Sequence, residues 1–233
     1  MMKYVTFSFD DGVTQDKRLV ELFNKYGLKA TFNLNSSLFG LKGGWEQNGK
    51  QLIHNKVYST EVKEIYEGHE VAVHTLTHPN LTCEEEETVV YQVEEDRKKL
   101  SQLVGYEVTG MAYPCGGVNN DDRVAEIIKT KTGVEYSRTI TSTYSFNLPE
   151  NMYRFNPTVH ICEADKLFQL AEQFLALTPS TPQVFYIWGH SYEFDVCDEM
   201  DWEILERFCQ LISGKADIHY ATNKEVFSRL HKI

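Results

Sequence analysis

Short apolar segments alternate with helix-like segments along this chain of 233 residues. Residues 4–9 and 30–34 are strand-like, and residues 17–26 between them carry apolar side chains at helical spacing and stop before Gly27. Parallel strands need long crossover connections, which helices usually supply. The alternation therefore predicts a parallel sheet with helices packed outside it.

The pattern continues to the end of the chain. The predicted later strands are 71–74, 110–113, 136–138, 158–161, 184–188 and 218–221, and the predicted helices are 60–67, 121–131, 164–177, 202–212 and one from 224. A capping box from Thr82 to Glu85 predicts the start of another long helix that reaches Val104. Residues 35–58 hold several glycines without clear periodicity, which predicts a long loop over the sheet. No linker interrupts the pattern, so we expect a single domain over residues 1–233.

Either an open doubly wound sheet or a barrel satisfies this alternation. Polar residues favour the barrel, because they follow the carboxyl ends of different strands, where barrel enzymes collect catalytic groups. These residues are Asp10, Asp11, His74, Pro114, Arg138 and His190. We therefore predict an α/β fold, a distorted or incomplete (β/α) barrel of seven or eight parallel strands with outer helices.

Charge and cysteine usage exclude several classes of function. A formal charge of -11 and a pI near 5.2 disfavour binding to nucleic acid or to an anionic membrane. The start of the chain lacks the apolar region of a secretory signal, and no apolar stretch approaches membrane-spanning length, so we expect a cytoplasmic protein. Five widely spaced cysteines indicate reduced thiols and not a disulfide framework.

Two acids and two histidines have the composition of a hydrolytic metal site. Asp10 and Asp11 end the first strand-like run, and His74 and His78 follow the run that begins at Glu70. A catalytic ion that keeps a position for water needs three protein ligands, and one carboxylate with two imidazoles suits zinc or a similar ion. We predict Asp11, His74 and His78 as ligands, and Asp10 as the base that takes the proton of the attacking water.

With these residues the chain resembles the polysaccharide deacetylase family, the NodB-like carbohydrate esterases. Residues 6–12 are similar to the family's first motif, which holds the base and a metal ligand, and residues 74–78 match its second, His-[Ser/Thr]-x-x-His. The resemblance extends over most of the chain. It implies a NodB-type barrel that removes an acetyl group from an N- or O-acetylated saccharide with one divalent ion, zinc foremost and cobalt or nickel as alternatives.

The third motif, usually Arg-x-Pro-Tyr, is altered. Ala112 stands where the arginine belongs and Cys115 where the aromatic belongs. Arg138, at the end of the next strand, is the candidate to replace the arginine beside Asp10, and a structural salt bridge is the alternative. We expect Tyr113, Pro114 and Cys115 to bind substrate, the last through its backbone N–H at the oxyanion.

The run from Trp188 to His190 resembles the fifth motif, Leu-x-His. By that resemblance His190 is the general acid and Trp188 lines the pocket for the acetyl methyl. Glu193 and Asp195 are both placed to pair with His190, and the fourth motif, which partners this histidine in the family, has no match. We expect the remaining histidines to be structural or exposed; they are His54, His69, His160, His219 and His231.

Two other functions stay open at this stage. The first is hydrolysis of a linear or cyclic amide that is not part of a sugar, since the same barrel family includes such enzymes. The second is saccharide binding without turnover, because the motif arginine is missing. The sequence leaves the sugar, the choice of amide or ester, and the oligomeric state undecided.

Overall fold

Strand β1 (Lys3–Asp10) is the centre of the sheet. In the computed structural model, which describes residues 2–47 and 49–230, β1 pairs with β9 along one edge and with β2 and β10 along the other, all in parallel. The strand order is β7-β6-β5-β2-β1-β9-β8, with β10 beside the first half of β1. The other strands are β2 (Ala30–Leu34), β5 (Glu70–Val73), β6 (Gly110–Ala112), β7 (Tyr136–Arg138), β8 (Val159–His160), β9 (Gln183–Gly189) and β10 (Ile218–Tyr220).

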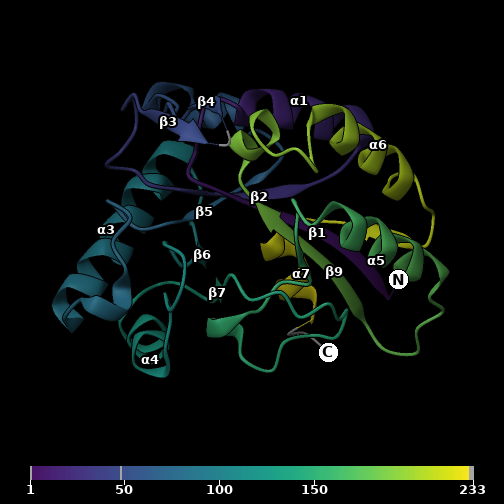
Figure 1. Cartoon of the computed structure of the whole chain (residues 1–233). Coiled ribbons are helices and arrows are strands. Elements are labelled where there is room, and N and C mark those ends of the chain that lie inside the picture. The colour runs from purple at the N-terminus through teal and green to yellow at the C-terminus, as the bar shows by residue number, and fades with distance from the viewer. Residues whose placement is uncertain (1, 48, 231–233) are drawn as a thin grey trace.

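Helices cover the outer face of this curved sheet (Figure 1). Helices α1, α5 and α6 lie along β1 and β9, and α3 and α4 lie beside β5, β6 and β7. The helices are α1 (Asp16–Tyr26), α2 (Val62–Ile65), α3 (Glu86–Val104), α4 (Asp122–Lys131), α5 (Ala164–Ala176), α6 (Trp202–Ile212) and α7 (Asn223–Leu230), with short 3-10 turns η1 (Ser59–Glu61), η2 (Leu81–Cys83), η3 (Met152–Arg154) and η4 (Ser191–Asp195). None of the helices in the described ranges is both long and apolar enough to cross a membrane.

Side chains along β1 alternate between the outer face of the sheet, where they are apolar, and the inner face, where they are polar. Phe7 and Phe9 face the helices, where Phe7 meets Phe23 of α1 with ring centroids 4.7 Å apart. Thr6 and Ser8, on the opposite face, accept hydrogen bonds from Asn223 (2.8 Å) and Arg138 (3.0 Å) inside the curve. Because side chains alternate along a strand, the main core lies between sheet and helices, and Asp10 continues the inner polar row.

Backbone hydrogen bonds from the loop that contains Phe155 and Thr158 close the barrel between β7 and β9, in place of continuous pairing between strands. Phe155 donates from its N–H to Ser137 O and accepts from Thr139 N–H, both at 2.8 Å, which ties it to β7. Three residues later Thr158 donates to Tyr186 O (2.8 Å) on β9. The prediction of an incomplete (β/α) barrel of parallel strands is confirmed.

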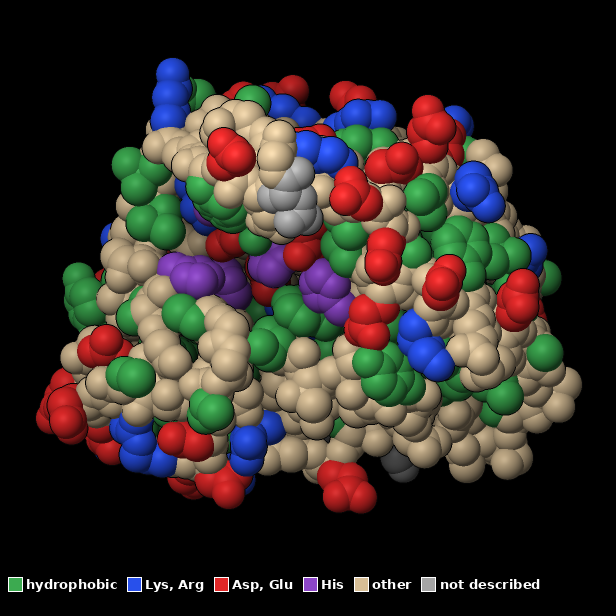
Figure 2. All heavy atoms as spheres, in the orientation of Figure 1, with side chains coloured by type: hydrophobic (Ala, Val, Ile, Leu, Met, Phe, Trp, Pro, Cys, Tyr) green, Lys and Arg blue, Asp and Glu red, His purple; other side chains and the backbone are tan. Residues whose placement is uncertain are grey.

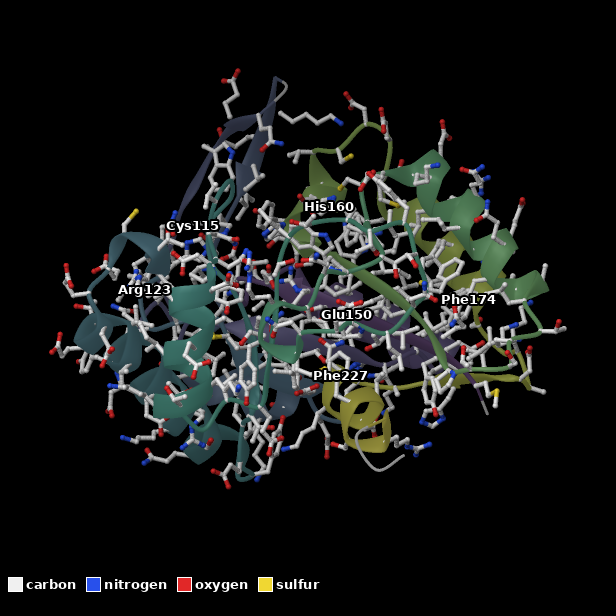
Figure 3. All side chains as sticks on the ribbon, turned by 90° about the horizontal axis from the view of Figure 1, so that it is seen from below. Cys115, Arg123, Glu150, His160, Phe174 and Phe227 are labelled. Carbon is white, nitrogen blue, oxygen red and sulfur yellow. The ribbon has the colours of Figure 1, made fainter. Side chains whose placement is uncertain are left out.

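Helix α7 fills the amino-terminal end of the barrel. Phe227 packs against Phe155 and Tyr136, with ring centroids 4.6 and 4.8 Å apart, and the N–H of Asn223 donates to Thr31 at the start of β2 (2.9 Å). In Figure 3 Phe227 lies at the end of the barrel opposite to Cys115 and His160. The open end is therefore the carboxyl end of the strands, the end predicted to hold the site.

Two local predictions were wrong. The expected loop 35–58 contains an antiparallel hairpin of β3 (Gly44–Gln47) and β4 (Lys50–Ile53). The expected capping box at Thr82 is a 3-10 turn, in which Asn80 accepts from the Thr82 N–H (3.1 Å), and α3 begins only at Glu86. His231 lies outside the described residues.

Candidate active site

A pocket of about 260 Å³ opens at the carboxyl end of the strands. Figure 2 shows histidine side chains gathered in a hollow of this face. The pocket is lined by Asp10, Asp11, His74, His78, Tyr113, Cys115, Gly116, Ile140, Trp188, His190 and Tyr192. They lie at the carboxyl ends of β1, β5, β6, β7 and β9 or in the loops that follow these strands. Residues far apart in the sequence meet here because parallel strands end at the same edge of the sheet.

Asp11, His74 and His78 form a compact set of ligand atoms, all within 4.8 Å of one another. Asp11 Oδ1 lies 3.7 Å from His78 Nε2, and the two imidazole rings lie 4.9 Å apart between centroids. His74 Nδ1 lies 2.9 Å from the Ala112 carbonyl oxygen, so it carries the proton and leaves Nε2 free toward the carboxylates. Mixed nitrogen and oxygen donors in this arrangement suit a divalent ion such as zinc.

Burial controls the protonation of these ligands. It lowers the pKa of His74 to about 4, so the imidazole is neutral near pH 7, as a metal ligand must be. Burial alone would raise the pKa of Asp11, but the His54 hydrogen bond and the Lys56 ammonium outweigh it and hold the pKa well below its usual range. Asp11 is therefore a carboxylate at neutral pH.

Left-handed backbone is concentrated around the pocket. Among the described residues five that are not glycine have positive φ, and four of these belong to the loops after β1, β5 and β6: Asp11 (83°), Thr75 (69°), His78 (63°) and Cys115 (69°). Side-chain donors hold three of these backbones, since Lys56 donates to Asp11 O (2.6 Å), Asn35 to Thr75 O (3.1 Å) and Asn119 to Cys115 O (2.8 Å). Such conformations cost about 1–3 kcal/mol each, so the surrounding hydrogen bonds keep the loops in a pre-organised shape.

Arg138 contacts Asp10 inside the barrel. Its Nη2 donates to both carboxylate oxygens of Asp10, and both side chains are buried. Arg138 occupies the position on β7 that is paired with Ala112 on β6, so the guanidinium enters the barrel one strand away from the altered third motif. Burial alone would raise the pKa of Asp10, but Arg138, His74 and His190 outweigh it and lower the pKa, which keeps Asp10 ionised.

The third-motif residues differ in what they present to the pocket. Tyr113 lines it and donates from its hydroxyl to Tyr153 O (2.7 Å). Cys115 also lines it, with Sγ 3.4 Å from His78 O, and within the described residues no group accepts from the Cys115 N–H. Pro114 is buried and is absent from the lining of the pocket.

His190 is followed by a turn that supplies its acidic neighbour. The ring Nδ1 of His190 lies 3.3 Å from Glu193 Oε1, and the backbone N–H of His190 donates to Glu193 Oε2 (2.8 Å). Asp195 is directed elsewhere, because it accepts from Gln15 (2.9 Å) and Trp202 (2.8 Å). Burial alone would lower the pKa of His190, but Glu193, with Asp11 and Asp10, raises it to about 9, so this imidazole is a cation at neutral pH.

His160 extends this arrangement on the far side of Glu193. Its Nε2 lies 3.4 Å from Glu193 Oε2, and its Nδ1 accepts from the Cys162 N–H (3.2 Å). The donor atoms of His160, His190 and Glu193 are close enough for a second metal ion. However, because the Cys162 N–H occupies Nδ1, the proton of neutral His160 is on Nε2, which then points a donor at Glu193. Glu193 thus lies between the two imidazoles, at ion-pair distance from each.

Two functional neighbours were missed by the sequence analysis. His54 Nε2 lies 3.2 Å from Asp11 Oδ2, and the buried Lys56 Nζ lies 3.2 Å from Asp11 Oδ1. Leu52, the buried residue of β4, is followed at intervals of two residues by His54 and Lys56. This spacing could have indicated an extended segment with one face toward the site. The segment is short, however, and it begins in an exposed hairpin.

Comparisons with known proteins identify relatives of this chain. A sequence model of the family described as polysaccharide deacetylase matches residues 2–136. A peptidoglycan-N-acetylglucosamine deacetylase of Listeria monocytogenes is 30% identical over 128 residues, which are 54% of this chain and 24% of that protein. The chain thus spans about a quarter of the length of the curated relative that it matches.

Solved structures share the fold at low identity. A family 4 carbohydrate esterase from Streptomyces lividans, in complex with acetate, has a TM-score of 0.55 at 15% identity and covers 90% of this chain and 88% of its own. The Xyl-CE4 domain of a multidomain xylanase, from the hindgut metagenome of Trinervitermes trinervoides, has a TM-score of 0.58 at 14% identity, and the match covers 99% of this chain and 92% of that domain. At these identities the likeness is one of fold.

Proposed function

The chain belongs to the polysaccharide deacetylase family, and on that premise we propose that it is a metal-dependent hydrolase that removes acetyl groups from an N- or O-acetylated saccharide. The observation that carries the proposal is the place of Asp10. Its carboxylate contacts Arg138 on one side and lies 4.0 Å from His74 Nε2 on the other, directly beside the Asp11–His74–His78 set.

Asp11, His74 and His78 would hold the ion, for which zinc is the expected identity and cobalt or nickel the alternatives. When bound, such an ion supplies Lewis acidity to the acyl carbonyl and to the attacking water. The protein's own part is to present a carboxylate and two neutral imidazoles without reorganisation. The low pKa of His74 and of Asp11 supports this role.

Asp10 is the general base. It takes a proton from water as the water attacks the acyl carbon, because its carboxylate is ionised and is not one of the three ligands. Arg138 fixes its orientation and lowers its pKa, which replaces the function of the missing motif arginine. The base is therefore always in the reactive form at neutral pH.

The two remaining steps use the loops after β6 and β9. The N–H of Cys115, which has no acceptor among the described groups, donates to the developing oxyanion. His190 then gives its proton to the departing amine or alcohol, and Glu193 keeps that proton available by raising the pKa of the imidazole to about 9. Trp188 forms the pocket wall, with its ring 4.6 Å below the Arg138 guanidinium.

Acetate release from N- and O-acetylated oligosaccharides, compared with hydrolysis of linear and cyclic amides that are not sugars, tests the proposal. Chelator-treated protein is assayed with zinc, cobalt or nickel, beside Asp10→Asn and His78→Ala. We expect release by the wild type with metal, none by Asp10→Asn, and weakened metal binding, measured by titration calorimetry, only in His78→Ala. Saccharide binding without release by the wild type in any metal would identify a binding protein, and release only from amides that are not sugars would identify an amide hydrolase.

A further inference from the structure

The two histidines of the candidate metal site differ in how their rings are held. The His74 side chain is 2% exposed, and the Ala112 carbonyl oxygen at the end of β6 accepts from its Nδ1 (2.9 Å). The His78 side chain is 32% exposed and belongs to the loop after β5. Its Nε2 faces Asp11, at 3.7 Å from Oδ1. A ligand that binds through Nε2 needs a partner at Nδ1 to keep this orientation.

The thiol of Cys115 lies beside this second nitrogen of His78. Cys115 belongs to the loop between β6 and α4, at the open end of the barrel (Figure 3). Its Sγ lies 3.7 Å from His78 Nδ1 and 3.4 Å from His78 O. Among the described residues, Nδ1 of His78 has no other hydrogen-bond partner. One short segment, from Ala112 to Cys115, thus supplies the outer contact of both histidines.

These two contacts determine which nitrogen of His78 carries the proton. A carbonyl oxygen only accepts, so the S–H of Cys115 donates to His78 O. The lone pairs of the sulfur are then available to Nδ1, and they accept from an N–H at that position. A neutral imidazole has a single N–H, so Nε2 keeps its lone pair toward Asp11. The thiol therefore favours the tautomer whose Nε2 can bind an ion.

Without the thiol, the contact between His78 and Asp11 favours the opposite tautomer. The Asp11 carboxylate accepts hydrogen bonds and faces Nε2. With no acceptor at Nδ1, the ring proton is more stable on Nε2, where it points at the carboxylate. In that position it occupies the lone pair that an ion needs, so it must move before the ion binds. The cost of moving it reduces the affinity for the ion.

The backbone on both sides of the contact is held in shape. His78 and Cys115 have positive φ values of 63° and 69°, which are uncommon for residues other than glycine. The His78 N–H donates to Thr75 Oγ1 (3.1 Å), and the buried Asn119 donates to Cys115 O (2.8 Å). These bonds fix the place where the sulfur and the imidazole meet. The contact is therefore formed before any ion arrives.

We propose that Cys115 is a positioning residue of the metal site, whose thiol accepts from His78 Nδ1–H and holds the imidazole with Nε2 toward the ion. This inference rests on the proposed function, because it assigns part of the affinity for the ion to a side chain that does not bind the ion. The role of the thiol is separate from that of the Cys115 backbone N–H at the oxyanion. A side-chain substitution to serine or alanine leaves that N–H in place.

Zinc titration calorimetry on the chelator-treated full chain tests the inference, and NMR of the metal-free protein reads the tautomer of the His78 ring. The variants are Cys115→Ala, which removes the acceptor, and Cys115→Ser, whose hydroxyl both donates and accepts. Cys83→Ala, at an exposed cysteine of η2, is the matched control for the loss of a thiol. Thermal unfolding of the metal-free variants establishes that each is folded.

We expect Cys115→Ala to bind zinc about tenfold more weakly than the wild type, and its His78 proton to move from Nδ1 to Nε2 in the metal-free protein. Cys115→Ser recovers part of the affinity, and Cys83→Ala retains all of it. Unchanged zinc affinity in folded Cys115→Ala, or a proton that stays on Nδ1, overturns the inference.

Two further results also decide against it. A sulfur-to-metal charge-transfer band in the cobalt-loaded wild type that Cys115→Ala lacks would make Cys115 a ligand and not a positioning residue. A wild type that binds no divalent ion contradicts the proposed function itself, and the inference fails with it. An ion-binding wild type whose affinity is unaffected by Cys115→Ala contradicts the inference alone.

Discussion

The side chains of Arg138 and Asp10 are in contact although β6, β5 and β2 lie between their strands in the sheet. The contact is possible because the sheet curves, so that β7 and β1 face each other across the barrel interior. Both groups are buried, and Ser8 accepts from the Arg138 Nε (3.0 Å) while Thr139 O accepts from Nη1 (3.0 Å). The pair is therefore fully bonded, as a buried ion pair must be to persist.

Replacing Arg138 tests its influence on Asp10. We expect Arg138→Met to lower kcat/KM by about 100-fold and the free energy of unfolding by about 3 kcal/mol, because the carboxylate is left buried without its partner. The pKa of Asp10 then rises, so the acidic limb of the pH–rate profile moves to higher pH. Steady-state kinetics across pH measures this.

Two further variants separate charge from general damage. Arg138→Lys keeps a cation but not the planar group, and we expect it to recover part of the activity. Arg207→Met, at an exposed position of α6, controls for the loss of an arginine elsewhere. An acidic limb that does not move in Arg138→Met would show that Arg138 is only a structural partner.

The contact between Glu193 and His190 predicts the pH above which activity is lost. His190 must be protonated to act as an acid, so activity falls as pH rises through its pKa, which is about 9. In Glu193→Gln the negative charge is gone, the pKa falls, and the alkaline limb moves to lower pH. Asp195→Asn is the matched control, since Asp195 contacts Gln15 and Trp202 instead. An NMR titration of the His190 ring measures the same pKa without turnover, and an unchanged value in Glu193→Gln would refute the assignment.

The strands and most helices could be predicted because the residues that they bury recur with the spacing of a strand or of a helix. Helix α6 was placed at the bounds observed, since its apolar residues recur at helical spacing between breaks. The β3–β4 hairpin was not, because most of its residues are exposed and its stability comes from tertiary contacts such as Gln15 with Ile53. The start of α3 was misplaced because Asn80, not Thr82, supplies the capping oxygen of the turn before it.

The site was predictable only to the extent that motifs carry it. The first two motifs predicted Asp11, His74 and His78 as ligands, and the fold brings these three residues together. The choice between Glu193 and Asp195 as the partner of His190 depended on the backbone course of η4, which the positions of the residues in the sequence do not determine. Arg138 and Asp10 are 128 positions apart, so their contact follows from the curvature of the sheet and from no local pattern.

The place of Lys56 predicts that it lowers the affinity of Asp11, His74 and His78 for a cation. Its buried ammonium lies 3.2 Å from Asp11 Oδ1, the oxygen that faces His78. Like charges repel strongly where water is excluded, so we expect Lys56→Gln to bind zinc about tenfold more tightly, measured by titration calorimetry. Lys17→Gln, an exposed lysine of α1, is the control. Weaker binding by Lys56→Gln would mean that holding the Asp11 backbone outweighs the charge.

Asp16 makes stability depend on pH. It is fully buried at the start of α1 and accepts hydrogen bonds from Ser191 and Tyr66, which lower its pKa less than burial raises it, so that the pKa is about 7 against an ordinary 3.8. The folded state therefore holds a proton that the unfolded state has lost between these two values. This contributes stability at acidic pH, and the contribution disappears as pH rises through 7.

Asp16→Asn removes that dependence, because the amide is uncharged at every pH. We expect the free energy of unfolding of the variant, relative to the wild type, to increase by about 2 kcal/mol between about pH 5.5 and about pH 8.5. Asp96, whose pKa burial also raises to about 7, is present in both proteins, so the difference isolates Asp16. Urea unfolding at several pH values measures it, and a difference that is constant with pH would mean that Asp16 is ionised in the folded protein throughout the range.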